Sequence, residues 1–303
     1  MTKHPPAAMS AEAQLFLARG SPTAHISPTE LPIEEIRSRT REVYRPASEQ
    51  AVKTNGVTCA HIEVAGIDCL EISPPQMRDT RQLIHLFGGG FVQGSPFEDL
   101  PISATLAAKT GARVISPTYR LAPEHPFPAA LEDVTAVTAA VLTDNPGTLL
   151  VGESAGGNLA LALVHRLRQQ GQSVPKAVAT LSPATDLDFM GDSHNADRDP
   201  FLPAAGTDFV CAAYLGDTDP QQPEVSPIYG KFDANFPPTL VTTGTRDLLL
   251  SGCVRLARVM REAGAPVDLR IWEGMWHVFE FFPGTPEAEA SLSEIAAFLE
   301  GYF

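Results

Sequence analysis

Cysteine is scarce in this sequence, and its few copies lie far apart. The 303 residues include four cysteines, with no Cys-x-x-Cys pair and no histidine at a spacing typical of a zinc site. We therefore expect reduced thiols and no bound metal. Two of the four, Cys59 and Cys69, flank a predicted hairpin turn at Ala65-Gly66, where they could face one another across the strands.

Positive charge is also in short supply. The chain has 22 lysines and arginines against 36 aspartates and glutamates, which gives a formal net charge of −14. This balance opposes binding to nucleic acid and to anionic membrane surfaces, because both are negatively charged themselves. We expect neither as a partner.

Long apolar runs are missing as well. No uncharged stretch is long enough to cross a bilayer, and the segment from Met1 to Pro6 has no apolar core like that of a signal peptide. The sequence therefore predicts a cytoplasmic protein without stable membrane association. With 44% hydrophobic residues, its length suits one large α/β domain with a modest appendage.

The most informative motif is a serine flanked by glycines. Gly152, Ser154 and Gly156 lie directly after the apolar run 148–151 and directly before a helix-like stretch at 158–170. A strand, a glycine-flanked serine and a helix form a nucleophile elbow, in which a sharp turn exposes the serine and glycine leaves room beside it. The motif alone is a weak signal, so its context decides.

A serine nucleophile of this type needs an acid and then a base later in the chain. Asp247 follows a predicted buried strand at 239–244, and His277 follows an alternating run at 267–272. In open α/β sheets, working side chains gather at the carboxyl ends of the strands. We therefore predict a catalytic triad of Ser154, Asp247 and His277.

A glycine-rich loop supplies the remaining part of such a site. Gly88, Gly89 and Gly90 follow the apolar run 83–87, and three glycines let the backbone approach a reacting carbonyl closely. The alternative is an ordinary flexible turn.

Strand-like and helix-like runs alternate along most of the chain, which predicts a mostly parallel sheet with crossover helices. Two short helical stretches, at 10–19 and 32–43, come first. Between residues 183 and 238 the alternation lapses into a segment rich in Asp, Pro and Gly, and so long an insertion is typical of a lid. Its expected helix lies around 207–215.

We accordingly divide the chain into an N-terminal cap part (1–45), a first core part (46–185), a cap insertion (186–236) and a second core part (237–303). Aromatic residues of the insertion that could line a pocket over Ser154 are Phe189, Phe201, Phe209 and Tyr214. Ordinary packing between cap and core is an equal alternative for each of them.

Five motifs follow one another along the chain: FGGGF at 87–91, YRLAPEHPFPA at 119–129, GESAGG at 152–157, GTRD at 244–247 and GMWH at 274–277. They resemble the hormone-sensitive-lipase-like branch of the α/β-hydrolases, also called family IV bacterial esterases, over most of the chain. The resemblance implies an α/β-hydrolase fold with a mostly parallel eight-stranded sheet, flanking helices and a helical cap. It also implies that Gly89, Gly90 and Ala155 offer the oxyanion N–H groups, and it favours a homodimer through the last strand and helix.

One position departs from the family pattern, because the glycine loop usually begins with histidine and this chain has Phe87 there. If 83–87 is a strand, His85 and Phe87 point to the same face, so His85 could reach some of the same surroundings. Alternatively, Phe87 packs against the core and the loop needs no histidine. We also expect Arg120 and Glu124 to hold the loop behind the elbow by ion pairing.

These parts together predict a serine carboxylesterase. His277 would remove the Ser154 proton, Ser154 would attack an ester carbonyl to give an acyl-enzyme, and water would release the acid without metal or organic cofactor. We expect short- to medium-chain esters as the small-molecule substrates. Two alternatives stay open: a lactone hydrolase with the same triad, suggested by the stretches 244–247 and 273–275, and a non-catalytic binding protein on a hydrolase scaffold.

Overall fold

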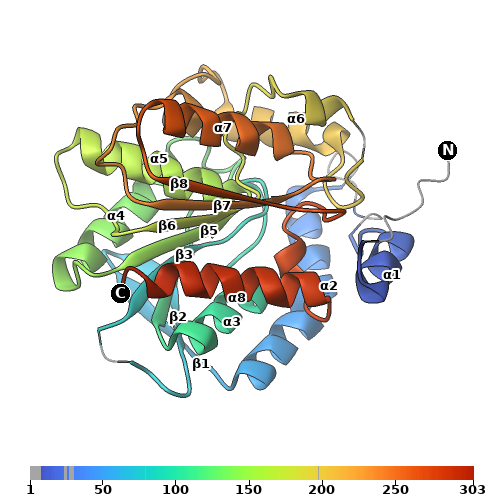
Figure 1. Ribbon diagram of the computed structural model, residues 1–303, viewed down its shortest axis with the longest axis horizontal. Helices are drawn as coiled ribbons and strands as arrows, with labels where there is room; N and C mark the ends of the chain where they lie inside the picture. Colours follow the sequence, from blue (N-terminus) through green and yellow to red (C-terminus); the bar gives the residue numbers. More distant parts are fainter. Residues whose placement is uncertain (1–7, 24–25, 27–30, 79, 197) are drawn as a thin grey trace.

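The computed structural model describes residues 8–23, 26, 31–78, 80–196 and 198–303. In these ranges the strands form one eight-stranded sheet, in the order β1-β2-β4-β3-β5-β6-β7-β8 (Figure 1). β2 pairs antiparallel with β1 and β4, and every other pair is parallel. The predicted mostly parallel sheet is confirmed. The strands are β1 (Thr58–Val64), β2 (Ile67–Ser73), β3 (Gln82–Leu86), β4 (Arg113–Pro117), β5 (Leu149–Glu153), β6 (Val178–Leu181), β7 (Thr239–Gly244) and β8 (Val267–Trp272).

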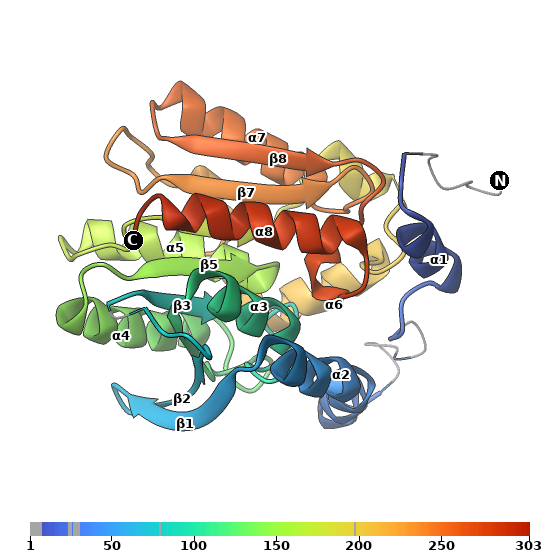
Figure 2. The same ribbon diagram turned by 60° about the horizontal axis from the view of Figure 1, so that its bottom comes forward.

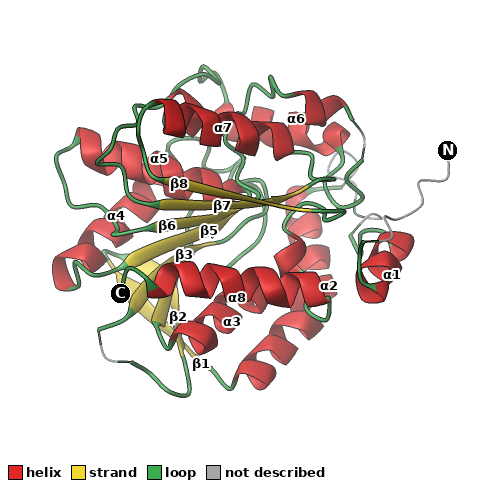
Figure 3. Ribbon diagram, in the orientation of Figure 1, coloured by secondary structure: helices red, strands yellow, loops and turns green. Residues whose placement is uncertain are grey.

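Helices cover both faces of this sheet (Figures 1 and 3). α3 and α8 pack on one face, and α4, α5 and α7 pack on the other. The helices are α1 (Ala11–Arg19), α2 (Ile33–Asn55), α3 (Leu100–Thr110), α4 (Ala129–Asp144), α5 (Ala155–Gln169), α6 (Ala204–Leu215), α7 (Leu250–Glu262) and α8 (Pro286–Glu300), with 3-10 turns η1 (Asp192–Asn195), η2 (Pro227–Tyr229) and η3 (Phe279–Phe281).

Alternation along the central strands explains why both faces are apolar. Leu83, Leu149 and Val151 pack towards α3 and α8, whereas Ile84 and Leu150 pack towards α4, α5 and α7. Successive side chains of a strand point to opposite faces, so a strand that is covered on both sides needs apolar residues at every position. The short apolar runs of the sequence are therefore the inner strands.

Helix α2 is longer than the sequence predicts. It continues through Pro46 to Asn55, past the expected end near residue 43, and the predicted boundary between 45 and 46 lies inside it. A proline within a helix removes one backbone hydrogen bond, but packing further along compensates. The Ser48 hydroxyl donates to the Glu98 carbonyl at 3.2 Å, and Ala51 joins the core cluster around α3.

The expectation that Cys59 and Cys69 face one another across the hairpin is wrong. Val64 pairs with Ile67 across the two-residue turn, and this register places Cys59 opposite Ile72 and Cys69 opposite Ile62. Cys59 is exposed and Cys69 is buried, and all four cysteines are free thiols.

Ion pairs of Arg120 and Glu124 hold the loop behind the serine, as the sequence predicts. Arg120 binds Asp133 of α4, with Nη2 and Oδ1 2.8 Å apart, whereas Glu124 binds Arg37 of α2 at 2.8 Å. Arg37 also donates to the carbonyls of Val92 and Ala122. The loop behind the serine is therefore tied to two helices rather than to itself.

Helices α1, α2 and α6 lie beyond the carboxyl ends of the parallel strands (Figure 2). The insertion contributes α6, which begins at Ala204 and contains the expected stretch 207–215. None of the helices in the described ranges is long and apolar enough to span a bilayer.

Gly156, in the first turn of α5, provides a test of this packing. A Cβ atom at this position would lie 1.9 Å from the Leu86 carbonyl oxygen and 2.4 Å from that of Phe87. Both contacts are with backbone, so we expect Gly156→Ala to lower the free energy of unfolding by about 2–4 kcal/mol in chemical denaturation. Gly301→Ala, where the nearest atom is 3.3 Å away, is the control and should change little. Equal stability of the two variants would contradict this close approach.

Candidate active site

Ser154 occupies the sharp turn between β5 and α5. Its φ and ψ angles are 53° and −118°, a conformation that a non-glycine residue rarely adopts. The turn is held because the Ser154 N–H donates to the Leu181 carbonyl at 2.9 Å. On the strand side, a Cβ at Gly152 would lie 2.4 Å from the Gly156 carbonyl oxygen, so glycine is required there. The strained turn is the nucleophile elbow expected from the sequence.

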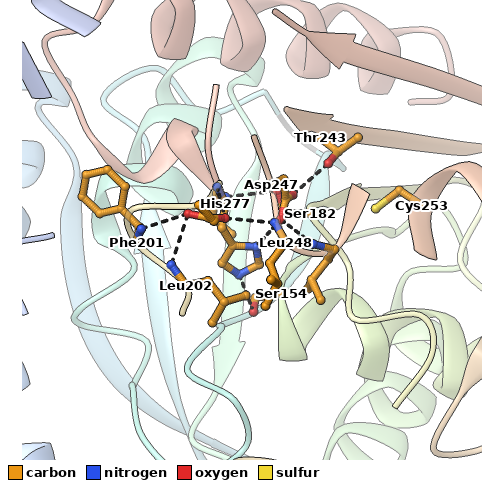
Figure 4. A network of polar contacts seen from close by, with 12 residues as sticks. Ser154, Ser182, Phe201, Leu202, Thr243, Asp247, Leu248, Cys253 and His277 are labelled. Carbon is orange, nitrogen blue, oxygen red and sulfur yellow. Dashed lines mark hydrogen bonds and ion pairs between the residues drawn. The ribbon is translucent and has the colours of Figure 1, made fainter. Parts of the chain in front are cut away.

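The structure brings together Ser154, His277 and Asp247 (Figure 4). His277 follows β8, and its Nε2 lies 2.9 Å from the Ser154 Oγ. Asp247 follows β7, and its Oδ1 lies 3.0 Å from the His277 Nδ1. Both distances are in the hydrogen-bonding range, and the order matches a serine, a base and an acid that orients the base.

Further hydrogen bonds fix the acid in place. The Thr243 hydroxyl donates to Asp247 Oδ2 at 2.7 Å, and the Leu249 N–H donates to Oδ1 at 2.9 Å. Burial disfavours the charged form of Asp247, but the attraction and hydrogen bond of His277 outweigh it, so its pKa is lowered. The His277 pKa is raised despite burial, because Asp247 favours the imidazolium.

The glycine loop faces the same point as Ser154. A Cβ at Gly88 would lie 3.3 Å from the Ser154 Cβ, and Gly89 and Gly90 have φ angles of 109° and 63°. Within the described part of the chain, the N–H groups of Gly89, Gly90 and Ala155 donate to no protein acceptor. They are free to bind a negatively charged oxygen beside Ser154.

Phe87 packs in the core, which is the second of the two alternatives given for this position in the sequence analysis. Its ring stacks on Tyr119 with centroids 4.0 Å apart, and the Tyr119 hydroxyl donates to the Phe87 carbonyl at 2.7 Å. β3 ends at Leu86, so Phe87 lies just beyond the strand. The residue at the start of the glycine loop is held by an aromatic contact and a backbone hydrogen bond.

A buried polar group lies behind the loop, and the sequence motifs did not predict it. Asp99 Oδ2 accepts the Gly88 N–H at 2.9 Å, and His85 Nε2 lies 3.0 Å from a carboxylate oxygen of Glu153. Burial raises the pKa of Glu153 to about 7 and lowers that of His85 to about 4, so the imidazole is neutral at neutral pH. The pKa of Asp99 is raised as well, mainly by burial and to a lesser extent by the charge of Glu153.

A cavity of about 670 Å³ opens above Ser154. Core and cap both line it, with Ile33 and Ile36 from α2 and Phe201 from the insertion. Of the four aromatic candidates, Phe189, Phe201 and Phe209 line this cavity. Tyr214 does not: it is buried beneath, stacked on Phe91 with ring centroids 3.7 Å apart.

Among the described residues, one group of side chains has the composition of a metal site. Asp199, Asp247 and His277 place their potential ligand atoms within 4.8 Å of one another. Each of them already hydrogen bonds to protein groups, so the group forms a hydrogen-bonded network.

Comparison with known proteins agrees with this geometry. A family model described as the alpha/beta hydrolase fold matches residues 83–281. The chain belongs to this family. An acetyl-hydrolase from Streptomyces hygroscopicus is 33% identical to this hydrolase over 265 residues, which cover 86% of this chain and 88% of the relative. An esterase from Acinetobacter venetianus is 35% identical over 78% of this chain and 80% of its own.

Comparison with solved structures narrows the family of this hydrolase to one branch. An esterase of the bacterial hormone-sensitive lipase family superposes with a TM-score of 0.89 and 31% sequence identity, over 97% of this chain and 99% of its own. The predicted resemblance to the hormone-sensitive-lipase-like branch is confirmed.

The packing of Phe87 leads to a prediction for the family's usual loop residue. In this hydrolase, Phe87→His would lose the stack on Tyr119 and bury a polar ring, so we expect no gain in ester turnover and a loss of about 1–3 kcal/mol in unfolding free energy. Phe87→Leu, which loses the stack but stays apolar, separates the two effects. A clear rise in turnover for Phe87→His would mean that packing does not replace the histidine.

The raised pKa of His277 predicts the acid limb of the pH profile. A general base must be neutral, so activity falls as the pH drops through that pKa. We expect the acid limb of kcat/KM to have its midpoint above the ordinary pKa of a histidine. Asp247→Asn removes the charge that raises the pKa, so the midpoint should fall, and kcat should decrease on the order of 10³–10⁴-fold. A midpoint that Asp247→Asn leaves in place would contradict the pairing.

Proposed function

We propose that this protein is a serine carboxylesterase that hydrolyses small carboxylic esters through an acyl-enzyme. The observation that carries the proposal is the chain of contacts from Ser154 Oγ to His277 Nε2, at 2.9 Å, and from His277 Nδ1 to Asp247, at 3.0 Å. The relatives named esterase and acetyl-hydrolase support the same chemistry.

In the proposed mechanism, His277 takes the hydroxyl proton of Ser154 as the serine oxygen attacks the ester carbonyl. The N–H groups of Gly89, Gly90 and Ala155 hold the resulting oxyanion, and each such donor is worth on the order of 3 kcal/mol of barrier. Collapse breaks the bond to the alcohol oxygen, which leaves with the proton from His277. Water, deprotonated by His277, then attacks the acyl-serine. The bond from the carbonyl carbon to Ser154 Oγ breaks as His277 returns the proton to that oxygen, which releases the acid.

Esters with short- to medium-chain acyl groups are the proposed substrates. A cavity of about 670 Å³ that is lined mainly by apolar side chains suits a small organic ester. The name of the Streptomyces relative, acetyl-hydrolase, points to the short end of this range. The substrate would reach Ser154 from the side covered by α2 and the insertion.

The proposal includes the division into a core (46–185 and 237–303) and a cap (1–45 and 186–236), with a cytoplasmic location. It also includes a homodimer, since β8 is an edge strand of the sheet and exposes Ile271, a residue that is 45% accessible. An edge strand with an exposed apolar residue is suited to pairing with a second chain.

A chromogenic ester series from two-carbon to sixteen-carbon acyl groups, with several lactones added, tests the proposal. We expect the wild type to hydrolyse the short and medium esters fastest, and Ser154→Ala to lose activity on the order of 10⁴–10⁶-fold. Ser173→Ala, at an exposed serine, is the matched control and should remain active.

Turnover of lactones without any linear ester would change the proposed substrate class and keep the triad. A folded wild type that hydrolyses neither would contradict the esterase proposal and favour a binding protein.

A further inference from the structure

Asp199 is a buried carboxylate in the insertion, and four backbone N–H groups donate to it. Its Oδ1 accepts from Phe201 at 2.9 Å and from Leu202 at 3.1 Å. Its Oδ2 accepts from Leu248 at 3.1 Å and from His277 at 3.0 Å. The Asp199 carboxylate therefore accepts hydrogen bonds from three separate segments of the chain.

The two oxygens face different parts of the molecule. Oδ1 binds the turn of the insertion that carries Phe201 and Leu202, both of which line the cavity over Ser154. Oδ2 accepts from the backbone N–H of His277, the triad base. It also accepts from the backbone N–H of Leu248, the residue after Asp247, which is the triad acid. Figure 4 shows Phe201, Leu202, Leu248 and His277 converging on this point.

Aromatic packing reinforces the same connection. Phe201 stacks on Trp276, the residue before His277, with ring centroids 5.0 Å apart. The insertion is thus attached to the loop that carries His277 in two ways. Phe201 makes an apolar contact with Trp276, and Asp199 accepts a hydrogen bond from the His277 N–H. A shift of the insertion would disturb the loops that hold the base and the acid.

The charge of Asp199 acts on the base as well. His277 is surrounded by three carboxyl groups, namely Asp247 after β7, Asp199 in the insertion and Glu280 in η3, and all three favour the imidazolium. Burial and the charge of Asp247 raise the pKa of Asp199 to about 6, against the opposing charge of His277 and the N–H donors of Phe201 and Leu248.

We propose that Asp199 is a positioning residue, which fixes the insertion onto the two triad loops and adds negative charge next to His277. This inference rests on the proposed triad. The cap is then part of the catalytic framework rather than a separate cover.

The test is Asp199→Asn, with Asp192→Asn as the matched control, since Asp192 is an exposed acid of the same insertion. The amide group would place its own N–H atoms against two backbone donors and would remove the charge. We expect kcat to fall about 10–100-fold with little change in KM, because misplaced catalytic groups affect the chemical step. The acid limb of kcat/KM should move to lower pH, because one of the three carboxylates that favour the imidazolium is gone.

Asp199→Glu separates charge from geometry. It keeps the charge on a longer side chain, so its acid limb should stay near that of the wild type while kcat still falls. A folded Asp199→Asn variant with the wild-type acid limb would overturn the proposal, whether or not its kcat is reduced, because a purely structural role predicts no shift.

Hydrogen–deuterium exchange gives a readout that needs no substrate. In Asp199→Asn, the segments 245–250 and 273–278 should lose protection together, and those of Asp192→Asn should not. Unchanged protection would overturn the positioning role even if activity falls. If the wild type hydrolyses no ester, the esterase proposal fails, and the exchange result alone then decides whether Asp199 holds the two loops.

Discussion

The arrangement of the site depends on one close approach, between the first turn of α5 and the end of β3. A Cβ at Gly156 would lie 1.9 Å from the Leu86 carbonyl oxygen, so the two backbones are in direct contact. Because the helix starts right after Ser154 and the glycine loop starts right after β3, this contact places the serine and the loop N–H groups around one point. A side chain at Gly156 would separate the nucleophile from the groups that stabilise its oxyanion.

The same packing determines what can lie behind the loop. Asp99 holds the N–H of Gly88, and Tyr119 holds the carbonyl of Phe87, so the two backbone groups that flank the Phe87–Gly88 bond both have partners. Little remains for a histidine at position 87 to do. His85 and Glu153, both buried, lie 3.0 Å apart on the strand side of the loop, and burial lowers the pKa of His85. The departure from the family pattern is therefore consistent with an ordered loop.

The parts of the site that could be predicted from the sequence are those with a local pattern. The elbow, the strands before Asp247 and His277 and the glycine loop each occupy a few consecutive residues whose types follow from the geometry they adopt. Asp199 acts on residues far along the chain, up to 78 positions away for the His277 N–H, and no short motif marks it. Asp99 lies only 11 positions from Gly88, but outside the glycine motif. The length of α2 was mispredicted for the same reason, because a tertiary contact of Ser48 with the Glu98 carbonyl helps to decide it. The ion-pair partner of Arg120, Asp133 of α4, could not be named from the sequence either.

The electrostatics around the base depend on how the surrounding acids are satisfied. Asp199 is bound by backbone N–H groups, and Glu280 accepts from the hydroxyls of Thr242 and Ser291, each at 2.8 Å. In the described residues, no ion pair joins Asp199, Asp247 or Glu280 to an arginine or lysine. Fixed dipoles stabilise a carboxylate without cancelling its charge, whereas a cation would do both. The imidazolium formed when Ser154 attacks therefore meets the negative charge of Asp247, whose pKa is lowered, and that charge needs no rearrangement at the moment of reaction.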